Sequence, residues 1–235
     1  MNTPTYGLVG RGRLATHLTH YLGLEGRNVV RWHRGAATPV GEGLHAAEVI
    51  LLAISDDAIE DFIEDHLDIG GRPTVHFSGS LTIDGVHGLH PLMTFGPVLY
   101  DLRTYRSIPF VGERGGACFD ELFPGLENLS WSIDPELRPL YHALCVLAGN
   151  FTTLSWVKAM EDFEAKLGLP REILRPYLEQ TAANTLERGR DALTGSLARA
   201  DHGTIERDLD GLEGDPFREV YLSYARIFAI GETTP

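Results

Sequence analysis

The chain has 235 residues, 43% of them hydrophobic, which is long enough for a real core in one large domain or two smaller ones. Its 20 Lys and Arg stand against 33 Asp and Glu, and the resulting net charge of -13 argues against a nucleic-acid-binding surface. No stretch approaches the ~20 apolar residues of a membrane span, no secretory signal begins the chain, and the isolated Cys118 and Cys145 fit small hydrophobes of a reduced, cytoplasmic protein.

A glycine-rich stretch, YGLVGRGRLA over residues 6–15, joins an expected strand to an expected helix. The pattern G-x-G-x-x-A in this position is typical of dinucleotide-binding folds. Gly10 allows the tight turn, Gly12 lets the backbone approach a pyrophosphate, and the N–H groups of the new helix face the phosphates. The alternative is an ordinary glycine turn. The predicted cofactor contacts here are Gly10, Gly12, Arg13 and Leu14.

A helix over residues 14–23 and a strand over residues 28–33 are expected next. In sites for NAD, an acidic residue about 20 residues after the glycines holds the ribose 2′-hydroxyl. This sequence has no carboxylate there, and Arg34 can instead receive a 2′-phosphate. The pattern favours NADP over NAD as the cofactor. The alternative is that Arg31 and Arg34 are plain surface charges.

Two further strands are expected over residues 48–54 and 74–77, and the first is apolar enough to be covered on both faces. Strands that alternate with helices predict a mostly parallel sheet. Ser55 and Ser78 each follow one of these strands and would lie at the carboxyl edge of the sheet, where nucleotides bind. Both are predicted cofactor contacts. A turn-stabilising role is the alternative for Ser78.

Asp57 and Glu60 fit a capping box that opens a helix extending to about residue 66. The segment 87–95 (HGLHPLMTF) is expected to be compact and irregular. Within it, His90 is the predicted proton donor, because its titration range suits reversible proton transfer; a structural histidine is the alternative. His87 and His90 lack a third ligand at a recognisable spacing, so no metal site is predicted.

The strand pattern ends near residue 135, and helical periodicity begins at residue 139. We therefore expect an α/β protein in which a Rossmann-type, mostly parallel sheet (1–135) precedes a smaller all-helical domain (136–235). The other expected elements are strands over 107–112 and 129–133, helices over 140–168, 170–189 and 216–230, and a polar turn region over 191–212.

Polar residues in the helical half are candidates for substrate binding. Asn150 lies in the middle of the first long helix, where an amide without partners is costly to bury, so a cleft-facing catalytic role is predicted. Thr194 and Arg199 form a second group, in which Arg199 can clamp a carboxylate through two N–H bonds. The alternative for Arg199 is a structural pairing with Asp201 or Glu206.

Several stretches, in order along the chain, resemble one family: GLVGRGRLA, LLAISDDAI, HFSGSL, GLHPLMTF, YHALCVLAGNFTTL and ALTGSLARADHGTIERDL. The family comprises Rossmann-like proteins whose C-terminal half is classed as domain of unknown function 2520. They are relatives of the pyrroline-carboxylate reductase, ketopantoate reductase and 6-phosphogluconate dehydrogenase groups. The last stretch departs from the family's A-L-T-G-P-x-x-R-G-D signature at Ser196 and Ala200. The resemblance implies NAD(P) binding and a helical domain that often dimerises, but little about the substrate.

These patterns together predict a cytoplasmic, homodimeric NADP-dependent oxidoreductase. It would transfer a hydride to or from a ketone or imine carbon of a small, carboxylate-bearing molecule, without nucleic acid or membrane as partner. Related hydroxyacid dehydrogenases place a catalytic Lys one helical turn before an Asn such as Asn150, whereas this chain has Val146 and Leu147 there. The missing Lys favours the alternative, a non-catalytic NAD(P)-binding sensor, while the polar clusters in both halves oppose it.

Overall fold

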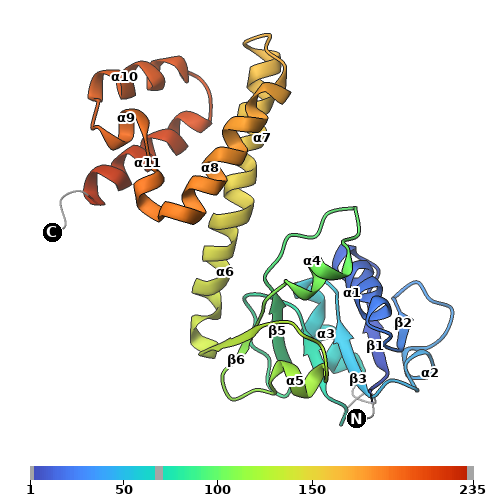
Figure 1. Cartoon of the computed structure of the whole chain (residues 1–235). Helices are drawn as coiled ribbons and strands as arrows, with labels where there is room; N and C mark the ends of the chain where they lie inside the picture. The colour runs from blue at the N-terminus through green and yellow to red at the C-terminus, as the bar shows by residue number, and fades with distance from the viewer. Residues whose placement is uncertain (1–2, 67–70, 232–235) are drawn as a thin grey trace. The chain divides into compact units, whose positions relative to one another are not determined.

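The computed structural model describes residues 3–66 and 71–231, with side chains up to residue 227. The chain divides into two compact units, Met1–Thr153 and Leu154–Pro235. In Figure 1 the ribbon is coloured by residue number, from blue at the N-terminus to red at the C-terminus. Helix α6 (Arg138–Val146) therefore belongs to the first unit. The predicted domain boundary at residue 135 stays a prediction.

Within the described residues, seven strands form one sheet in the order β2-β1-β3-β4-β5-β6-β7. All neighbouring strands run parallel except β5 and β6, which are antiparallel. The topological switch lies between β1 and β3, because the chain moves from β1 to one side and then returns to the other. The strands are β1 (Tyr6–Val9), β2 (Val29–Trp32), β3 (Val49–Leu52), β4 (Thr74–His76), β5 (His87–Pro91), β6 (Phe110–Glu113) and β7 (Ser130–Ile133).

Helices cover both faces of this sheet, which explains the continuous apolar runs of its central strands. In β3, Val49 and Leu51 join one core and Ile50 and Leu52 join the other. Each fully buried Leu or Ile contributes about 1.5–3 kcal/mol to folding. The first core also contains residues of α1 (Arg13–Leu24), α4 (Leu102–Arg106) and α5 (Phe119–Leu122), and the second contains residues of α2 (Val40–Gly43) and α3 (Ile59–Asp65).

The glycine turn after β1 passes unusually close to the end of β3. Gly10 has φ +132°, a conformation that L-residues rarely adopt, and a Cβ at this position would lie 2.2 Å from the carbonyl oxygen of Ala53. The Gly10 N–H donates to the carbonyl of Trp32 at 2.9 Å, which joins the turn to β2. Glycine at position 10 is therefore dictated by the packing of three neighbouring strands.

Helical conformation continues without a break from α6 through a π-helical segment, η4 (Leu147–Phe151), into α7 (Thr152–Ala165). No helix among the described residues combines the length and apolar character that a bilayer crossing requires. The remaining helices of the second unit are η5 (Arg171–Leu174), α8 (Arg175–Arg188), η6 (Gly189–Ala192), α9 (Gly195–Ala198), α10 (His202–Gly211) and α11 (Phe217–Gly231).

The structure corrects three local predictions. Residues 87–91, expected to be irregular, form β5, in which Gly88 leaves space for a buried ion pair described below. The capping box of Asp57 and Glu60 does not form, because the helix begins as a 3₁₀ turn, η1 (Asp56–Ala58), without a side-chain cap. The polar turn region over 191–212 contains α9 and α10, the latter capped by Asp201.

The cysteine prediction is also partly wrong. Both cysteines are free, but Cys118 is exposed and not a buried small hydrophobe. It stands at the N-cap of α5, where Glu121 accepts a hydrogen bond from its backbone N–H at 2.8 Å. Its position at a helix start, where polar residues are favoured, explains the exposure.

Candidate functional site

The N-terminus of α1 is open and uncapped at the carboxyl edge of the sheet. Gly12 is its N-cap residue, no side chain caps the helix, and its first turn carries no acidic residue. Arg11, Gly12 and Arg13 are exposed, and a Cβ added to Gly12 would meet no atom within 4 Å. Leu14, predicted to contact cofactor, packs its half-buried side chain against the first core. The free N–H groups and helix dipole leave room and charge for a phosphate.

Arg34 lies beside this helix end. Trp32, the last residue of β2, pairs with Val9 at the end of β1, so the loop after β2 leaves the sheet next to the glycine turn. Arg34 is exposed, and no described residue forms a hydrogen bond or ion pair with it. His33 turns the loop by accepting the N–H of Gly35 at its Nδ1, 3.1 Å away. An unpartnered guanidinium therefore follows β2 next to the glycine turn, and its contact with a ribose 2′-phosphate stays a prediction.

Ser55 and Ser78 lie at the same edge but differ in their freedom. Ser55 is exposed directly after β3 and caps nothing through its side chain. Ser78 is buried; its hydroxyl donates to Asp56 Oδ2 at 2.6 Å and accepts the N–H groups of Ser80 and Leu81 at 3.2 and 3.1 Å. The hydroxyl of Ser78 thus stabilises a turn. Contact of either serine with a cofactor stays a prediction.

His90 lies on β5, which runs parallel to β4, so its carboxyl end is at the edge of the glycine turn. Its Nδ1 is 2.8 Å from the hydroxyl oxygen of Tyr141 on α6, and no described group bonds its Nε2. Burial, then His142 and Arg138, lower the pKa of His90 to about 4, against a small opposing effect of Asp56. The imidazole is therefore neutral at pH 7, held at one nitrogen and free at the other.

Arg138 anchors the start of α6 to the sheet. Its side chain is 0% exposed, its Nη2 donates to the carbonyl of Ser78, and its Nε lies 3.3 Å from Glu113 Oε1. A Cβ at Gly88 would lie 2.5 Å from that carboxylate oxygen and 3.1 Å from Arg138 Nη1. Breaking a buried ion pair costs about 3–5 kcal/mol. Arg138 therefore fixes the position of the α6 residues that follow it, including Tyr141.

His76 ends β4 as a fully buried imidazole without a partner. Among the described residues, nothing forms a hydrogen bond with either ring nitrogen. It pairs in register with Leu52 and Gly88, which places its side chain on the face of the sheet that carries Arg138. Burial and then Arg138 lower the pKa of His76 to about 4, with Asp56 opposing. The folded protein therefore accepts His76 only in its neutral form.

Asn150 lies inside the π-helical segment η4 and is exposed in the single chain. π-helical segments occur frequently at functional sites. The hydroxyls of Thr152 and Thr153 accompany the segment by donating to the carbonyls of Leu147 and Gly149, at 3.3 and 2.8 Å. The predicted catalytic role of Asn150 stays a prediction, but the residue lies within the distorted part of the helix.

Thr194 and Arg199 belong to the second unit. Both are exposed; Thr194 stands at the N-cap of α9, and no described carboxylate lies within ion-pair distance of Arg199. Asp201, a predicted alternative partner, instead caps α10 by accepting the Thr204 N–H and hydroxyl at 3.1 and 2.8 Å. The side chain of Arg199 is thus available for a ligand, and substrate binding stays a prediction.

Ala200 shows how the departure from the family signature is accommodated. It is the non-glycine residue of the described chain with a positive φ, +50°, at the position where the family's signature has Gly. A Cβ makes this left-handed conformation costly, by roughly 1–2 kcal/mol. The chain therefore holds Ala200 in a conformation that glycine adopts more readily.

Sequence reasoning missed much of the cluster around His90. Arg138, Glu113 and His76 are polar residues that normally lie at the surface, and no local pattern marks them as buried. Tyr141 carries no local pattern that marks it as a partner of His90. No three His, Cys, Asp or Glu side chains gather as a metal site in the described part of the chain.

Comparison with known proteins supports the sequence motifs. Residues 112–227 match the family model described as Domain of unknown function (DUF2520). The predicted resemblance is confirmed. No curated protein matches the chain.

Solved structures share the fold over almost the whole chain. A Bacteroides fragilis protein, whose proposed activity is that of an NADP oxidoreductase, has 23% identity and a TM-score of 0.77, with 96% of this chain and 98% of that chain covered. An imine reductase from Myxococcus stipitatus in complex with NADP+ has 14% identity, a TM-score of 0.65 and coverages of 96% and 93%. Pyrroline carboxylate reductase of Plasmodium falciparum with NADP bound has 14% identity, a TM-score of 0.59 and coverages of 96% and 96%. The predicted Rossmann-type fold with helical C-terminal part is confirmed.

The buried His76 makes stability depend on pH. Its folded pKa of about 4 lies below the unfolded value of 6.5, so its contribution to stability is full above pH 6.5 and is lost as the pH falls toward 4. The shift corresponds to about 3 kcal/mol at most. We expect the unfolding free energy, measured with urea at pH 7, 5 and 4, to fall less in His76→Phe than in the wild type. Parallel pH dependences in the two proteins would contradict the assignment.

Relief of the strained turn gives a second prediction. Ala200→Gly is expected to raise the unfolding free energy by about 0.5–1 kcal/mol. Removing the Cβ relieves strain in the folded state, and this exceeds the stabilisation that glycine's greater conformational entropy gives the unfolded state. The matched control is Ala183→Gly, an exposed site within α8, which should lower it by about 0.5–1 kcal/mol. Urea unfolding measures both. Destabilisation of equal size in the two variants would show that position 200 is not strained.

Proposed function

We propose that this chain is a cytoplasmic NADP-dependent oxidoreductase that transfers a hydride to or from a ketone or imine carbon of a small molecule. One observation carries the proposal: an uncapped helix N-terminus with an unpartnered Arg34 beside it lies at the same sheet edge as a neutral His90 with a free Nε2. The first feature fits a phosphorylated dinucleotide, and the second fits proton transfer at a reacting atom. The NADP that two of the similar structures contain supports the cofactor choice.

The residues present fit NADP in space and charge. Gly12 leaves open the space above the α1 N-terminus, where backbone N–H groups would hold the pyrophosphate. Arg34 would hold the 2′-phosphate, with Arg13 adding positive charge near the same helix end. Asp56 does not compete for these donors, because its carboxylate accepts the Ser78 hydroxyl.

When bound, NADPH supplies the hydride. The chain must position the substrate, move a proton and exclude water. His90, near the carboxyl end of β5, would exchange a proton through Nε2. Asn150, in the π-helical segment, would orient the substrate. In the second unit, Thr194 and Arg199 would bind substrate, with the guanidinium of Arg199 holding a carboxylate.

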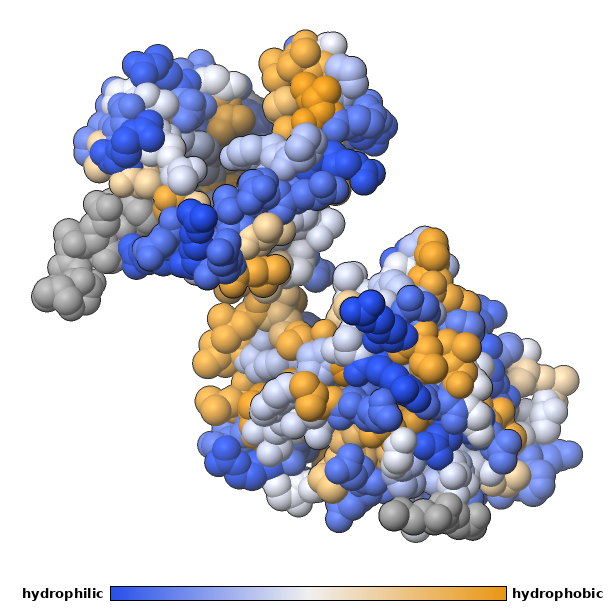
Figure 2. Space-filling view, in the orientation of Figure 1, coloured by the Kyte–Doolittle hydropathy of each residue, from blue (hydrophilic) through white to orange (hydrophobic). Residues whose placement is uncertain are grey.

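We further propose a homodimer formed through the helical part. Among the described side chains after residue 153, the buried apolar ones are Leu174 and Leu178, at 8% and 9% exposure. Two buried apolar side chains form too small a core to stabilise a unit of this size. Many other apolar side chains are exposed, and large exposed apolar surfaces mark interaction sites. Figure 2 shows apolar surface over these helices. The exposed apolar residues of α6–α8 and α11 include Leu140, Leu144, Leu154, Tyr177, Val220 and Ile227.

The cofactor assignment predicts a difference between NADPH and NADH. A ligand at ~100 times its Kd adds about 2.7 kcal/mol, which raises the unfolding midpoint by roughly 5–10 °C for a chain of this size. We expect a larger shift with NADPH than with NADH. Arg34→Ala should lower the NADPH shift to about half, as a tenfold loss of affinity requires, and leave the NADH shift unchanged.

Two control variants separate this effect from general ones. Arg31→Ala removes the same charge from an exposed position within β2 and should leave both shifts intact. Gly12→Ala should abolish both shifts while lowering stability by no more than about 0.5–1 kcal/mol, because its Cβ meets open space. Equal NADPH and NADH shifts in the wild type would overturn the role of Arg34.

Turnover separates an oxidoreductase from a sensor. NADPH oxidation is followed by absorbance at high protein concentration against pools of keto acids and cyclic imines. Oxidation is expected with at least one pool, and charge-neutral analogues of its members should react more slowly if Arg199 binds a carboxylate. NADPH binding without oxidation in any pool would favour the sensor, to which the missing Lys before Asn150 also points.

A further inference from the structure

The strongest unassigned feature is the hydrogen bond between His90 and Tyr141. We propose that Tyr141 supplies the proton of the proposed reaction and that His90 passes it to the substrate. The inference rests on the proposed function and deepens it by naming the proton path. Tyr141 acts through His90 and is therefore a positioning and proton-supplying residue.

The geometry leaves His90 with one bound and one free nitrogen. Nδ1 is 2.8 Å from the Tyr141 hydroxyl oxygen, and the ring of His90 stands nearly perpendicular to that of Tyr141. Nε2 lies across the imidazole from this bond and has no partner among the described residues. Gly79 lies beside the rings of His90 and His142. A Cβ at position 79 would lie 3.3 Å from His90 Cδ2 and 2.6 Å from His142 Cδ2, so a side chain there would crowd both rings.

We assign the hydroxyl of Tyr141 as the donor of this hydrogen bond, because of its other neighbour. The other neighbour of the hydroxyl is the thiol of Cys145, one helical turn further along α6. An imidazole nitrogen is a stronger acceptor than a thiol sulfur. The hydroxyl therefore donates to Nδ1, and His90 carries its own proton on Nε2, facing away from Tyr141.

The surrounding charges keep both groups neutral. Around His90 lie His142 and Arg138 on α6 and Asp56 after β3, and burial with the two basic groups lowers its pKa to about 4. Burial also raises the pKa of Tyr141 above its usual range. A histidinium donor is thus scarce at pH 7, whereas the neutral pair is present from about pH 5 to beyond pH 9.

The transfer balances with the neutral pair. When bound, the dihydronicotinamide would supply a hydride to the substrate carbon, and the π electrons of the C=N or C=O bond would move to nitrogen or oxygen. That atom takes the proton from His90 Nε2, while Nδ1 takes the proton from Tyr141 Oη. Tyrosinate remains, and a proton from water restores it after the product leaves; the reverse reaction runs through the same atoms.

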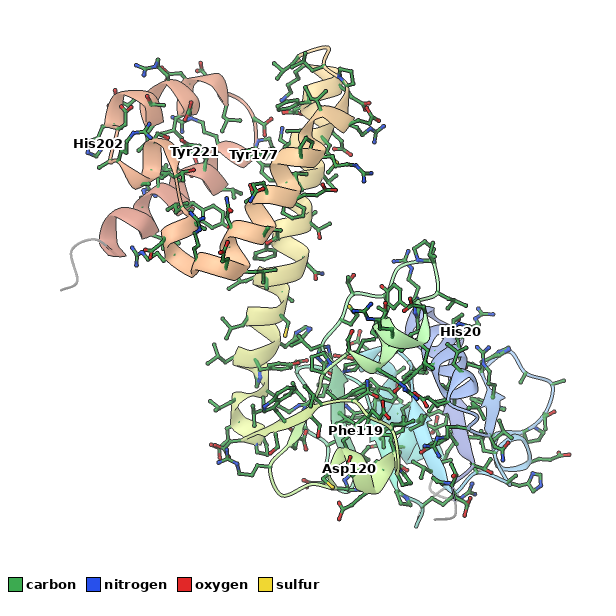
Figure 3. The ribbon with its side chains drawn as sticks, in the orientation of Figure 1. His20, Phe119, Asp120, Tyr177, His202 and Tyr221 are labelled. Carbon is green, nitrogen blue, oxygen red and sulfur yellow. The ribbon has the colours of Figure 1, made fainter. Side chains whose placement is uncertain are left out.

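Tyr141→Phe tests the relay. General acid catalysis contributes 10²–10⁴-fold, so we expect kcat with a substrate found in the pools to fall at least about 100-fold, while KM changes less than about threefold. The matched control is Tyr221→Phe on α11, labelled in Figure 3; it also removes a hydroxyl that makes a hydrogen bond, to Asp208 Oδ2 at 2.8 Å, and should keep wild-type kcat. Wild-type kcat should be flat from about pH 6 to 9, whereas a histidinium donor would lose tenfold per pH unit.

A second readout needs no turnover. Long-range ¹H–¹⁵N NMR of the histidine rings reports which nitrogen carries the proton, and His90→Gln identifies the His90 signals among the ten histidines. We expect His90 to be protonated at Nε2 in the wild type and to become a mixture of tautomers in Tyr141→Phe. This measurement applies to the protein with and without NADPH.

The outcomes distinguish failure of the proton path through Tyr141 and His90 from failure of the proposed oxidoreductase function. An active wild type with an equally active Tyr141→Phe, or with an unchanged His90 tautomer in that variant, overturns the relay alone. A kcat that falls as the pH rises from 6 to 9 does the same. A wild type that binds NADPH and turns over no pool overturns the proposed function, and the relay with it, even where the tautomer is as expected.

Discussion

The burial of one cation, the guanidinium of Arg138, positions most of the candidate site. Arg138 begins α6, and its bonds to the Ser78 carbonyl and its closeness to Glu113 hold that helix against β4, β5 and β6. Truncating such a residue leaves a buried charge or polar group without a partner, which is why the arrangement tolerates little displacement. Tyr141, one turn after Arg138, reaches His90 because this anchor sets the height and rotation of α6.

The same cation shapes the electrostatics of its neighbours. Arg138 contributes to the lowered pKa of both His76 and His90, although burial is the larger cause for each. Glu113 compensates this charge, with its Oε1 3.3 Å from Arg138 Nε, yet both histidines are still held in their neutral forms.

Local sequence patterns predicted the elements whose structure depends mainly on neighbouring residues. The glycine turn, the apolar run of β3 and the periodicity of α1 were sufficient for the Rossmann-type sheet and its carboxyl edge. β5 was missed because Gly88 and Pro91 disfavour a strand locally, and Gly88 is explained only by the Arg138–Glu113 pair, which comes from distant segments. α9 and α10 were missed because their sequence is polar and interrupted by glycines. The cluster around His90 required tertiary information that no spacing contains.

The two motif glycines separate structure from function. Gly10 is required by the chain itself, because its φ and the carbonyl of Ala53 admit no side chain. Gly12 has an ordinary extended conformation, with φ -71°, and open space where a Cβ would be. Nothing in the fold demands glycine at position 12, and N-cap positions elsewhere favour Ser, Thr, Asp or Asn because these side chains bond the free N–H groups. Because glycine has no side chain to bond them, the N–H groups at the start of α1 remain free for an outside acceptor. Gly12 is therefore stronger support for the proposed phosphate site than Gly10 is.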